Sequence, residues 1–239
     1  MTGNAPGVAL AELAGLLADR TRATFCLALL DGRAWTAGEL AAEAGVAAST
    51  ASEHLDRLLA GGLLVQRRQG RHRYVQLAGP GVAELLEGLV AHAGPDPRPR
   101  GSLRAATASA ALARARTCYD HLAGKLGVVL TDALVARGLL DGSAGFAFTE
   151  AGRQWLATLG PGAANHPPST RRPLARACLD WTERRSHLAG AAGALLCAHF
   201  FDRGWVRRIG GGRAVRLTPA GEAALRDVFG VDPAAAGLR

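Results

Sequence analysis

Residues 49 to 73 carry a concentration of hydroxyl, imidazole and guanidinium side chains, which are groups that bind nucleic acid. Short polar side chains and an arginine on the exposed face of a helix can reach base edges in the major groove. Four arginines at a hairpin tip cannot be core residues, and they are placed to meet phosphates or a minor groove. The candidate DNA-contacting residues are Ser49, Thr50, Ser52, His54 and Arg57 on the helix, and Arg67, Arg68, Arg71 and Arg73 on the hairpin.

Two helices and a tight turn must position the first group of these side chains. Thr36 and Glu39 form a capping-box pattern that starts the first helix, and Gly45 permits the sharp turn after it. The second helix stops at Gly61-Gly62. Its buried face is predicted from residues three and four apart, namely Ala51, Leu55, Leu58 and Leu59.

A hairpin must position the arginines. Two strands, 63–65 and 74–77, are expected to flank the basic tip 66–73. Helix, turn, helix and basic hairpin in this order predict a winged helix-turn-helix, a fold that reads DNA. The alternative interpretation is a winged helix that contacts another protein and whose arginine-rich loop is merely solvated.

Several short motifs in this region resemble the ArsR/SmtB family of bacterial repressors. They are Asp19-Arg20-Thr21-Arg22, Glu39-Leu40-Ala41, Gly45-Val46, Ser49-Thr50-x-Ser52-x-His54-Leu55, Gly62-Leu63-Leu64, Arg68-x-Gly70-Arg71 and Tyr74-x-Gln76-Leu77. The resemblance covers about residues 8–93. It implies a repressor that binds double-stranded DNA as a homodimer built on helices 8–18 and 81–93. Many relatives cap the recognition helix with a serine, whereas this chain has Ala47 there, so Ser49 is the alternative cap.

A second group of side chains, in the C-terminal half, could act as a sensor. It consists of Cys118, His121, Cys178 and His187. Cys118 and His121 are three residues apart, which predicts a shared helix face. Together with Asp120 and Asp180 the set could bind zinc or another transition metal, or its thiols could sense an oxidant. Alternatively the cysteines only pack as small apolar residues. A small-molecule pocket between two segments is the remaining alternative, lined by Tyr119, Trp181, His121 and His187.

The metal sites that are common in the ArsR/SmtB family are absent from this sequence. The helix 36–44 holds no cysteine or histidine. The helix 81–93 offers Glu84, Glu87 and His92, but not the family's pattern of Asp and His. The sequence therefore leads us to assign no metal and no cofactor, and the inducer is left as a small molecule or an oxidant.

Four blocks of the C-terminal half occur twice in one order, which predicts an internal duplication of a winged-helix-like unit. Residues 115–120 match 175–180, 121–124 match 187–190, 137–140 match 203–206, and 149–152 match 218–221. Two proline-containing linkers divide the chain. The predicted organisation is a winged helix-turn-helix domain at 1–93, a linker at 94–101, a first repeat at 102–160, a linker at 161–169, and a second repeat with a tail at 170–239.

The composition excludes several classes of protein. The chain has 239 residues, of which 49% are hydrophobic, with no run of eighteen apolar residues and no basic-then-apolar leader, so we expect no membrane association. The net charge of +8 resides in residues 101–239, because the first hundred residues hold ten arginines and ten acidic residues. That excess could hold DNA by counterion release or simply be solvated. Four cysteines without a C-x-x-C pair indicate a reduced, cytoplasmic protein. The sequence contains no recognisable catalytic motif, so we do not expect an enzyme.

These observations predict a mainly α fold with small β wings, in which an N-terminal winged helix-turn-helix precedes two winged-helix-like repeats. The expected function is a sequence-specific DNA-binding transcriptional regulator, a repressor released by an inducer. The alternatives are a ligand- or metal-sensing module without DNA binding, and a protein-interaction scaffold of winged-helix units.

Overall fold

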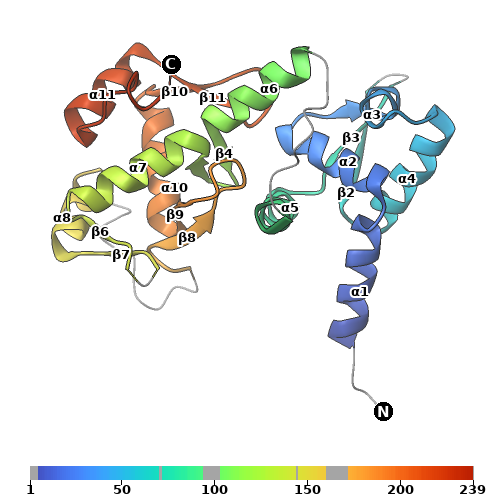
Figure 1. Ribbon diagram of the computed structural model, residues 1–239, viewed down its shortest axis with the longest axis horizontal. Helices are drawn as coiled ribbons and strands as arrows, with labels where there is room; N and C mark the ends of the chain where they lie inside the picture. Colours follow the sequence, from blue (N-terminus) through green and yellow to red (C-terminus); the bar gives the residue numbers. More distant parts are fainter. Residues whose placement is uncertain (1–4, 70–71, 94–102, 144, 160–171, 239) are drawn as a thin grey trace. The chain divides into compact units, whose positions relative to one another are not determined.

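The structure is a computed structural model that divides the chain into two units, residues 1–86 and 87–239. The described residues, drawn in colour in Figure 1, are 5–69, 72–93, 103–143, 145–159 and 172–238. Both predicted linkers, 94–101 and 161–169, lie outside the described residues. The boundary between the units falls inside helix α5 (Pro80–Ala93), and the two predicted repeats belong to one unit.

Unit 1 contains four helices, a short 3-10 helix and a three-stranded antiparallel sheet among its described residues. In chain order these are α1 (Ala5–Leu17), α2 (Arg20–Ala28), η1 (Leu29–Asp31), β1 (Trp35–Thr36), α3 (Ala37–Ala44), α4 (Ala48–Ala60), β2 (Leu64–Gln69) and β3 (His72–Leu77). Strand β3 is central, since it pairs with both β1 and β2. Helices α3 and α4 and the β2–β3 hairpin form the predicted winged helix-turn-helix.

Side-chain caps fix where two of these helices begin. Asp19 caps α2 by accepting a hydrogen bond from the backbone N–H of Arg22 at 2.9 Å. Thr36 and Glu39 form the predicted capping box at the start of α3, which satisfies two backbone N–H groups. The apolar faces that follow are buried in one core, which includes Phe25, Leu29, Leu40, Leu55 and Leu58.

The start of α4 and the extent of the wing differ from the prediction. Ala47 occupies the cap position of α4 and makes no side-chain hydrogen bond, so the prediction that Ser49 caps this helix is wrong. The tight turn before it places Gly45 at φ 67°, a left-handed conformation that glycine adopts without strain. The strands of the wing are longer than the predicted 63–65 and 74–77. Strand β2 runs to Gln69 and β3 begins at His72, so most of the predicted tip 66–73 belongs to the antiparallel ladder.

Unit 2 begins within α5 and continues through α6 (Leu103–Arg114), after which one order of elements occurs twice. That order is two strands, a helix, two strands and a helix. The first set is β4 (Arg116–Cys118), β5 (His121–Ala123), α7 (Gly124–Ala136), β6 (Leu140–Asp141), β7 (Ala147–Phe148) and α8 (Glu150–Thr158). The second set is β8 (Arg176–Leu179), β9 (Ser186–Ala189), α10 (Gly190–Asp202), β10 (Val206–Arg208), β11 (Val215–Leu217) and α11 (Pro219–Phe229). The predicted fold class is confirmed, whereas the duplication stays a prediction that this repeated order supports.

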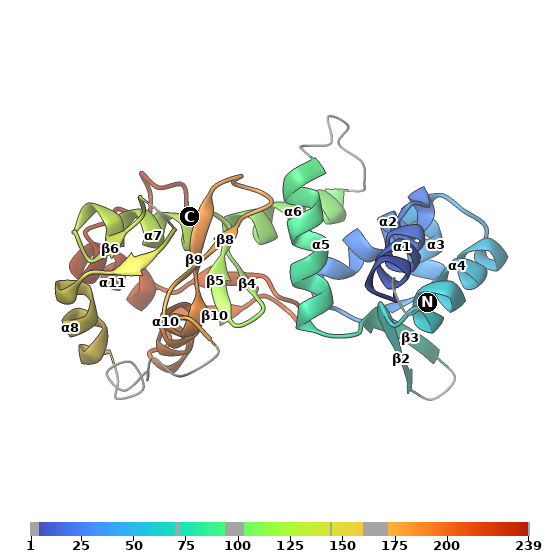
Figure 2. The same ribbon diagram turned by 90° about the horizontal axis from the view of Figure 1, so that it is seen from below.

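The two sets interlock around one shared core. Strand β5 lies against α10 and β9 lies against α7, and Figure 2 shows the hairpins β4–β5 and β8–β9 side by side. A side-chain carbon built on Gly193 of α10 would lie 3.1 Å from Cβ of His121. One built on Gly127 of α7 would lie 3.5 Å from Cβ of His187. Each histidine therefore packs over a glycine of the other set.

None of the helices described here combines the length and the apolar character that crossing a membrane requires.

Candidate nucleic-acid interface and Cys–His cluster

Helix α4 presents part of the predicted contact set to solvent. Ser49, Thr50 and Arg57 are exposed. Ser52 is half-buried, and its hydroxyl donates to the backbone carbonyl of Ala48 at 3.0 Å. The exposed side of α4 thus offers hydroxyl groups and a guanidinium group, which are the types that hydrogen-bond to bases and phosphates.

His54, which the sequence predicts to contact DNA, is partly buried beside α2. Its side chain is only 17% exposed, and Nδ1 lies 3.6 Å from the Asp19 carboxylate and 3.4 Å from the Arg22 guanidinium. The helical period explains this placement, because His54 is three residues after Ala51 and four before Leu58, both of which are buried. His54 therefore helps to join α4 to α2.

The wing carries exposed arginines on both of its long strands. Arg67, Arg68 and Arg73 are exposed, and Arg68 lies opposite Arg73 in the β2–β3 ladder. Arg73 also donates to Asp56 of α4 at 2.8 Å, which ties the wing to the helix. Arg71 lies outside the described residues. Arg67 and Arg68 are therefore the clearest wing residues for a test of DNA contact.

The Cys and His residues of the second predicted group all lie on strands of two-stranded hairpins. Cys118 on β4 is paired with His121 on β5, and Cys178 on β8 is paired with His187 on β9. The prediction that Cys118 and His121 share a helix face is therefore wrong. A spacing of three suits one helical turn, but it equally suits opposite positions across a two-residue turn. Here that turn includes Tyr119, at φ 56°.

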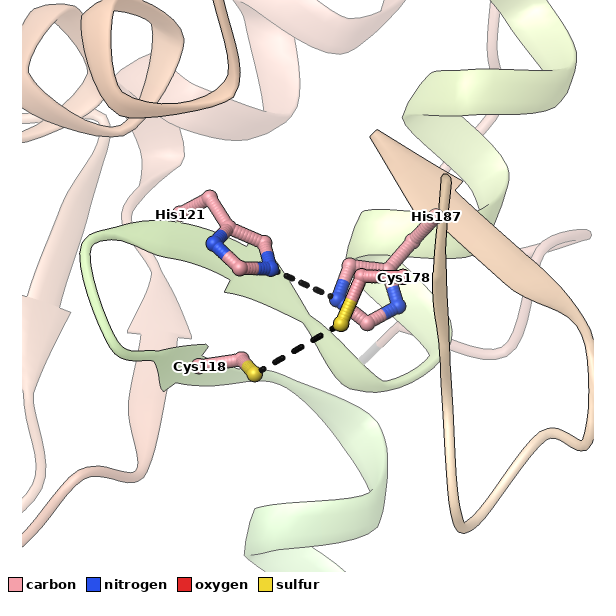
Figure 3. A group of neighbouring side chains, drawn as sticks. All are labelled: Cys118, His121, Cys178 and His187. Carbon is pink, nitrogen blue, oxygen red and sulfur yellow. Dashed lines mark hydrogen bonds between the residues drawn. The ribbon is translucent and has the colours of Figure 1, made fainter. Parts of the chain in front are cut away.

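Figure 3 shows the four side chains pointing toward one another. The sulfurs of Cys118 and Cys178 are 4.0 Å apart, and the Nε2 atoms of His121 and His187 are 3.1 Å apart. One donor atom from each residue lies within 4.8 Å of every other. Cys118 and both histidines are 1% exposed, whereas Cys178 is half-buried. Two sulfurs and two imidazole nitrogens thus converge on one small, mostly closed volume.

A network of ion pairs adjoins this cluster. Arg116 is completely buried, and its guanidinium lies 3.0 Å from the Asp180 carboxylate and 3.5 Å from that of Glu87. Glu87 in turn accepts hydrogen bonds from Arg213 at 2.7 Å and from the Cys118 thiol at 2.9 Å. Buried charges are tolerated when they are paired in this way.

These contacts shift the pKa values of the two thiols in opposite directions. The hydrogen bond with Cys118 lowers the pKa of Cys178 against the effect of burial, and hydrogen bonds with His121 and His187 lower it further. The hydrogen bond to Cys178, burial and the charge of Glu87 all raise the pKa of Cys118. Of the two thiols, Cys178 is therefore the one that loses its proton more readily.

Sequence reasoning missed Glu87 and Arg213 as neighbours of the cluster. An arginine precedes each cysteine by two residues, which predicts positive charge near both thiols, but only Arg116 is buried there and the equivalent Arg176 is exposed. Nothing in the sequence points to Glu87, because its contact with Cys118 spans 31 residues and joins a helix to a hairpin.

The residues predicted to line a small-molecule pocket do not line one. A hollow of about 590 Å³ does lie between the two segments, but its lining comes from α7, including Val129 and Arg137, and from the end of α11, including Phe229. The space between α7 and α10 is a cavity of about 20 Å³, lined by residues such as Leu122, Leu130 and Leu196, and it would hold about one water molecule. Tyr119 is 51% exposed. Trp181 instead lies over the Arg116 guanidinium, whose central carbon is 5.0 Å from the ring centroid.

Comparisons with known proteins agree with the arrangement of unit 1. A family model described as a helix-turn-helix domain matches residues 17–67. The uncharacterized HTH-type transcriptional regulator YdfF of Bacillus subtilis (strain 168) is 39% identical over 216 residues, which are 90% of this chain and 94% of that protein. The HTH-type transcriptional regulator CmtR of Mycobacterium bovis is 43% identical over 82 residues, which are 34% of this chain and 69% of that protein.

One solved structure is that of the homodimeric winged helix-turn-helix DNA-binding domain Mb0332 from Mycobacterium bovis, described as a possible ArsR-family regulator. It is 30% identical, with a TM-score of 0.35, and the match covers 39% of this chain and 90% of that one. Since the Bacillus relative covers 90% of this chain, its similarity includes most of the unit that holds the Cys–His cluster.

Proposed function

Because the chain belongs to the ArsR-type helix-turn-helix transcriptional regulators, we propose that it acts as a homodimeric repressor that an inducer releases from its operator. Because it is a member of this family, the chain is a DNA-binding regulator. What the proposal adds is the set of contact residues, the homodimer, the sign of regulation and a signal received by unit 2.

The exposed side of α4 and the wing carry the proposed DNA contacts. Ser49, Thr50 and Arg57 are exposed on a helix whose opposite face is held in the core of unit 1. In the winged helix-turn-helix arrangement such a helix lies in the major groove, and the wing meets the backbone or the minor groove. Arg67 and Arg68 on β2 then supply phosphate contacts, which add affinity without adding sequence information.

Helices α1 and α5 carry the proposed dimer contacts. Val8 and Leu10 on α1 are 54% and 67% exposed, and Leu85 and Leu89 on α5 are 38% and 48% exposed. Large apolar side chains exposed together on a helix are typical of an interaction surface. The resemblance to the ArsR/SmtB family assigns the dimer to these same two helices, and a second copy of the chain is the occupant we propose.

The single observation that carries this proposal is the combination of an exposed polar α4 with a basic wing on one small unit. A cytoplasmic location is the prediction that goes with a DNA partner. The inducer is proposed to be a small molecule, an oxidant or, as argued below, a metal ion.

The test is binding of the full chain to fluorescent duplex DNA from upstream of its own gene, compared with a shuffled duplex of equal composition. We expect tighter binding to the natural duplex, with a stoichiometry of two chains per site and a dimer by sedimentation. Equal affinity for both duplexes would overturn the assignment of sequence reading to α4. A monomer that binds with unchanged specificity would overturn the homodimer and leave the DNA contacts standing.

A further inference from the structure

We propose that the Cys–His cluster is a binding site for one divalent transition-metal ion of the zinc class, held by Cys118, His121, Cys178 and His187. Zinc favours four nitrogen and sulfur ligands in a tetrahedral arrangement, and two cysteines with two histidines satisfy that preference. The four ligands come from two hairpins of unit 2, and none comes from the winged helix-turn-helix.

The spacing of the donor atoms fits a tetrahedron around a single ion. With zinc–sulfur and zinc–nitrogen bonds of about 2.3 and 2.1 Å, neighbouring ligand atoms lie about 3.4–3.8 Å apart. The sulfurs of Cys118 and Cys178 are 4.0 Å apart, and the Nε2 atoms of His121 and His187 are 3.1 Å apart. Small side-chain rotations therefore bring all four atoms to bonding distance from one centre.

The backbone presents the ligands in matched pairs. Each cysteine lies directly opposite its histidine across an antiparallel pair, so both side chains leave the same face of the hairpin. Gly193 makes room for His121, and Gly127 makes room for His187. Each of the four strands thus contributes one cysteine or histidine to the site, and both sets of elements enclose it.

A carboxylate group lies near the Nδ1 atom of each histidine, away from the Nε2 atom that faces the cluster. Nδ1 of His121 is hydrogen-bonded to the Asp120 carboxylate at 3.4 Å, whereas Nδ1 of His187 lies 3.5 Å from the Asp180 carboxylate without a hydrogen bond to it. Histidine ligands of metals usually have such an acceptor behind the ring, which fixes the tautomer and makes the other nitrogen a better ligand. In both rings the nitrogen left for the ion is Nε2, the atom that already faces the cluster.

The surrounding charges match a divalent cation. Glu87 is paired with Arg213, and Asp180 is paired with Arg116. Each of these ion pairs has no net charge. Two cysteine thiolates would therefore bring two uncompensated negative charges into a closed volume. A divalent ion cancels both charges, and the protons of the thiols are released to solvent.

A disulfide between Cys118 and Cys178 is the rival use of these residues. It requires the sulfurs to approach to about 2.0 Å and an oxidant to accept two electrons while two protons leave. It would use neither histidine. The convergence of both Nε2 atoms on the sulfurs favours the metal site, since a disulfide gives no reason for their position.

The metal site is independent of the repressor proposal, whereas the role of the ion as the inducer rests on it. The test therefore begins with binding alone. The probe is Co²⁺, added to the full chain after reduction and removal of metals with a chelator. We expect one Co²⁺ per chain, a sulfur-to-cobalt charge-transfer band, the intense visible bands of tetrahedral cobalt, and displacement by Zn²⁺.

Substitution of a ligand should abolish this spectrum. Cys178→Ser and His187→Gln are expected to lose the tetrahedral bands and to bind Co²⁺ at least about tenfold more weakly. Matched controls are Cys197→Ala, a buried cysteine outside the cluster, and His92→Gln, an exposed histidine. Both controls should keep the spectrum, and circular dichroism should show that every variant is folded.

The unaltered chain provides a second readout that does not depend on folded variants. Zn²⁺ should slow the alkylation of Cys178, which is half-buried, when the reaction is followed by mass spectrometry. Reduced protein that shows neither tetrahedral cobalt nor zinc protection would overturn the site, and recovery of a Cys118–Cys178 disulfide would assign it to redox chemistry instead. Operator binding measured on the same samples separates the two proposals. Absence of operator binding by the metal-free chain, together with an intact cobalt spectrum after metal is added, would count against the repressor alone.

Discussion

At the scale of single residues, Arg116 and Arg176 hold equivalent places in the two sets of elements but have opposite environments. Arg116 is completely buried between carboxylates, whereas Arg176 is exposed. The two sets therefore share an order of elements without sharing a charge pattern. The buried ion-pair network next to the cluster depends on Arg116 alone.

We expect Arg116→Ala to lower the free energy of unfolding by about 3–5 kcal/mol, because removal of one partner leaves buried carboxylates uncompensated. The affected groups are Asp180 and Glu87. Arg207→Ala, an exposed arginine of β10, is the control and should cost no more than about 0.5 kcal/mol, as is usual at the surface. Urea unfolding of both variants measures this difference, and similar midpoints for the two would contradict it.

Asp120→Asn should weaken metal binding without abolishing it. The Asp120 carboxylate lies behind His121 and is also paired with Arg172, so it acts on the ion only through the histidine. Loss of such an outer partner usually costs about 10–100-fold in metal affinity. Cobalt titration in competition with a chelator gives the number, and Asp132→Asn, which alters a surface pair with Arg185, is the control. An unchanged affinity would remove Asp120 from the site.

At the scale of elements, the sequence predicted best where the signals are local. The capping box at Thr36, the turn at Gly45 and the stop after α4 depend on neighbours in the chain, and each is confirmed. The β4–β5 hairpin was mistaken for a helix because a spacing of three between Cys118 and His121 satisfies both geometries. Its convergence with β8–β9 arises from packing over long sequence separations, which local patterns do not encode.

The wing should act on DNA through charge. Replacing Arg67 and Arg68 together by alanine is expected to weaken binding by similar factors on specific and random duplexes. The slope of log affinity against log salt should fall by about two, because two phosphate contacts are lost. Arg153→Ala, an exposed arginine of α8, is the control. An unchanged slope in the double variant would remove these arginines from the contact surface.

Helix α5 offers a route by which the cluster could influence DNA binding. Glu87 accepts a hydrogen bond from the Cys118 thiol, and a sulfur bound to a metal ion has no proton to donate. We expect Glu87→Gln to keep tetrahedral cobalt binding but to reduce the effect of zinc on operator affinity. Glu84→Gln, one turn earlier on α5, serves as the control. Full zinc response in Glu87→Gln would exclude this contact as the link.

At the scale of the whole molecule, one helix takes part in both units. Ala83 and Leu86 of α5 belong to the core of unit 1, and Glu87 begins unit 2. The sequence predicted a boundary at the proline-rich stretch after residue 93, where composition changes. It could not indicate that Glu87 is held by Cys118 and Arg213, because such pairing depends on the folded unit.

Metal binding at the Cys–His cluster is proposed to regulate the DNA affinity of the chain. The most direct measurement is operator affinity of the full chain with and without one equivalent of Zn²⁺, for the unaltered protein and for His187→Gln. We predict that zinc weakens operator binding by about 5–150-fold in the unaltered chain, the usual range of allosteric coupling, and leaves the variant unchanged. Equal operator affinity with and without bound zinc in the unaltered chain would contradict the account.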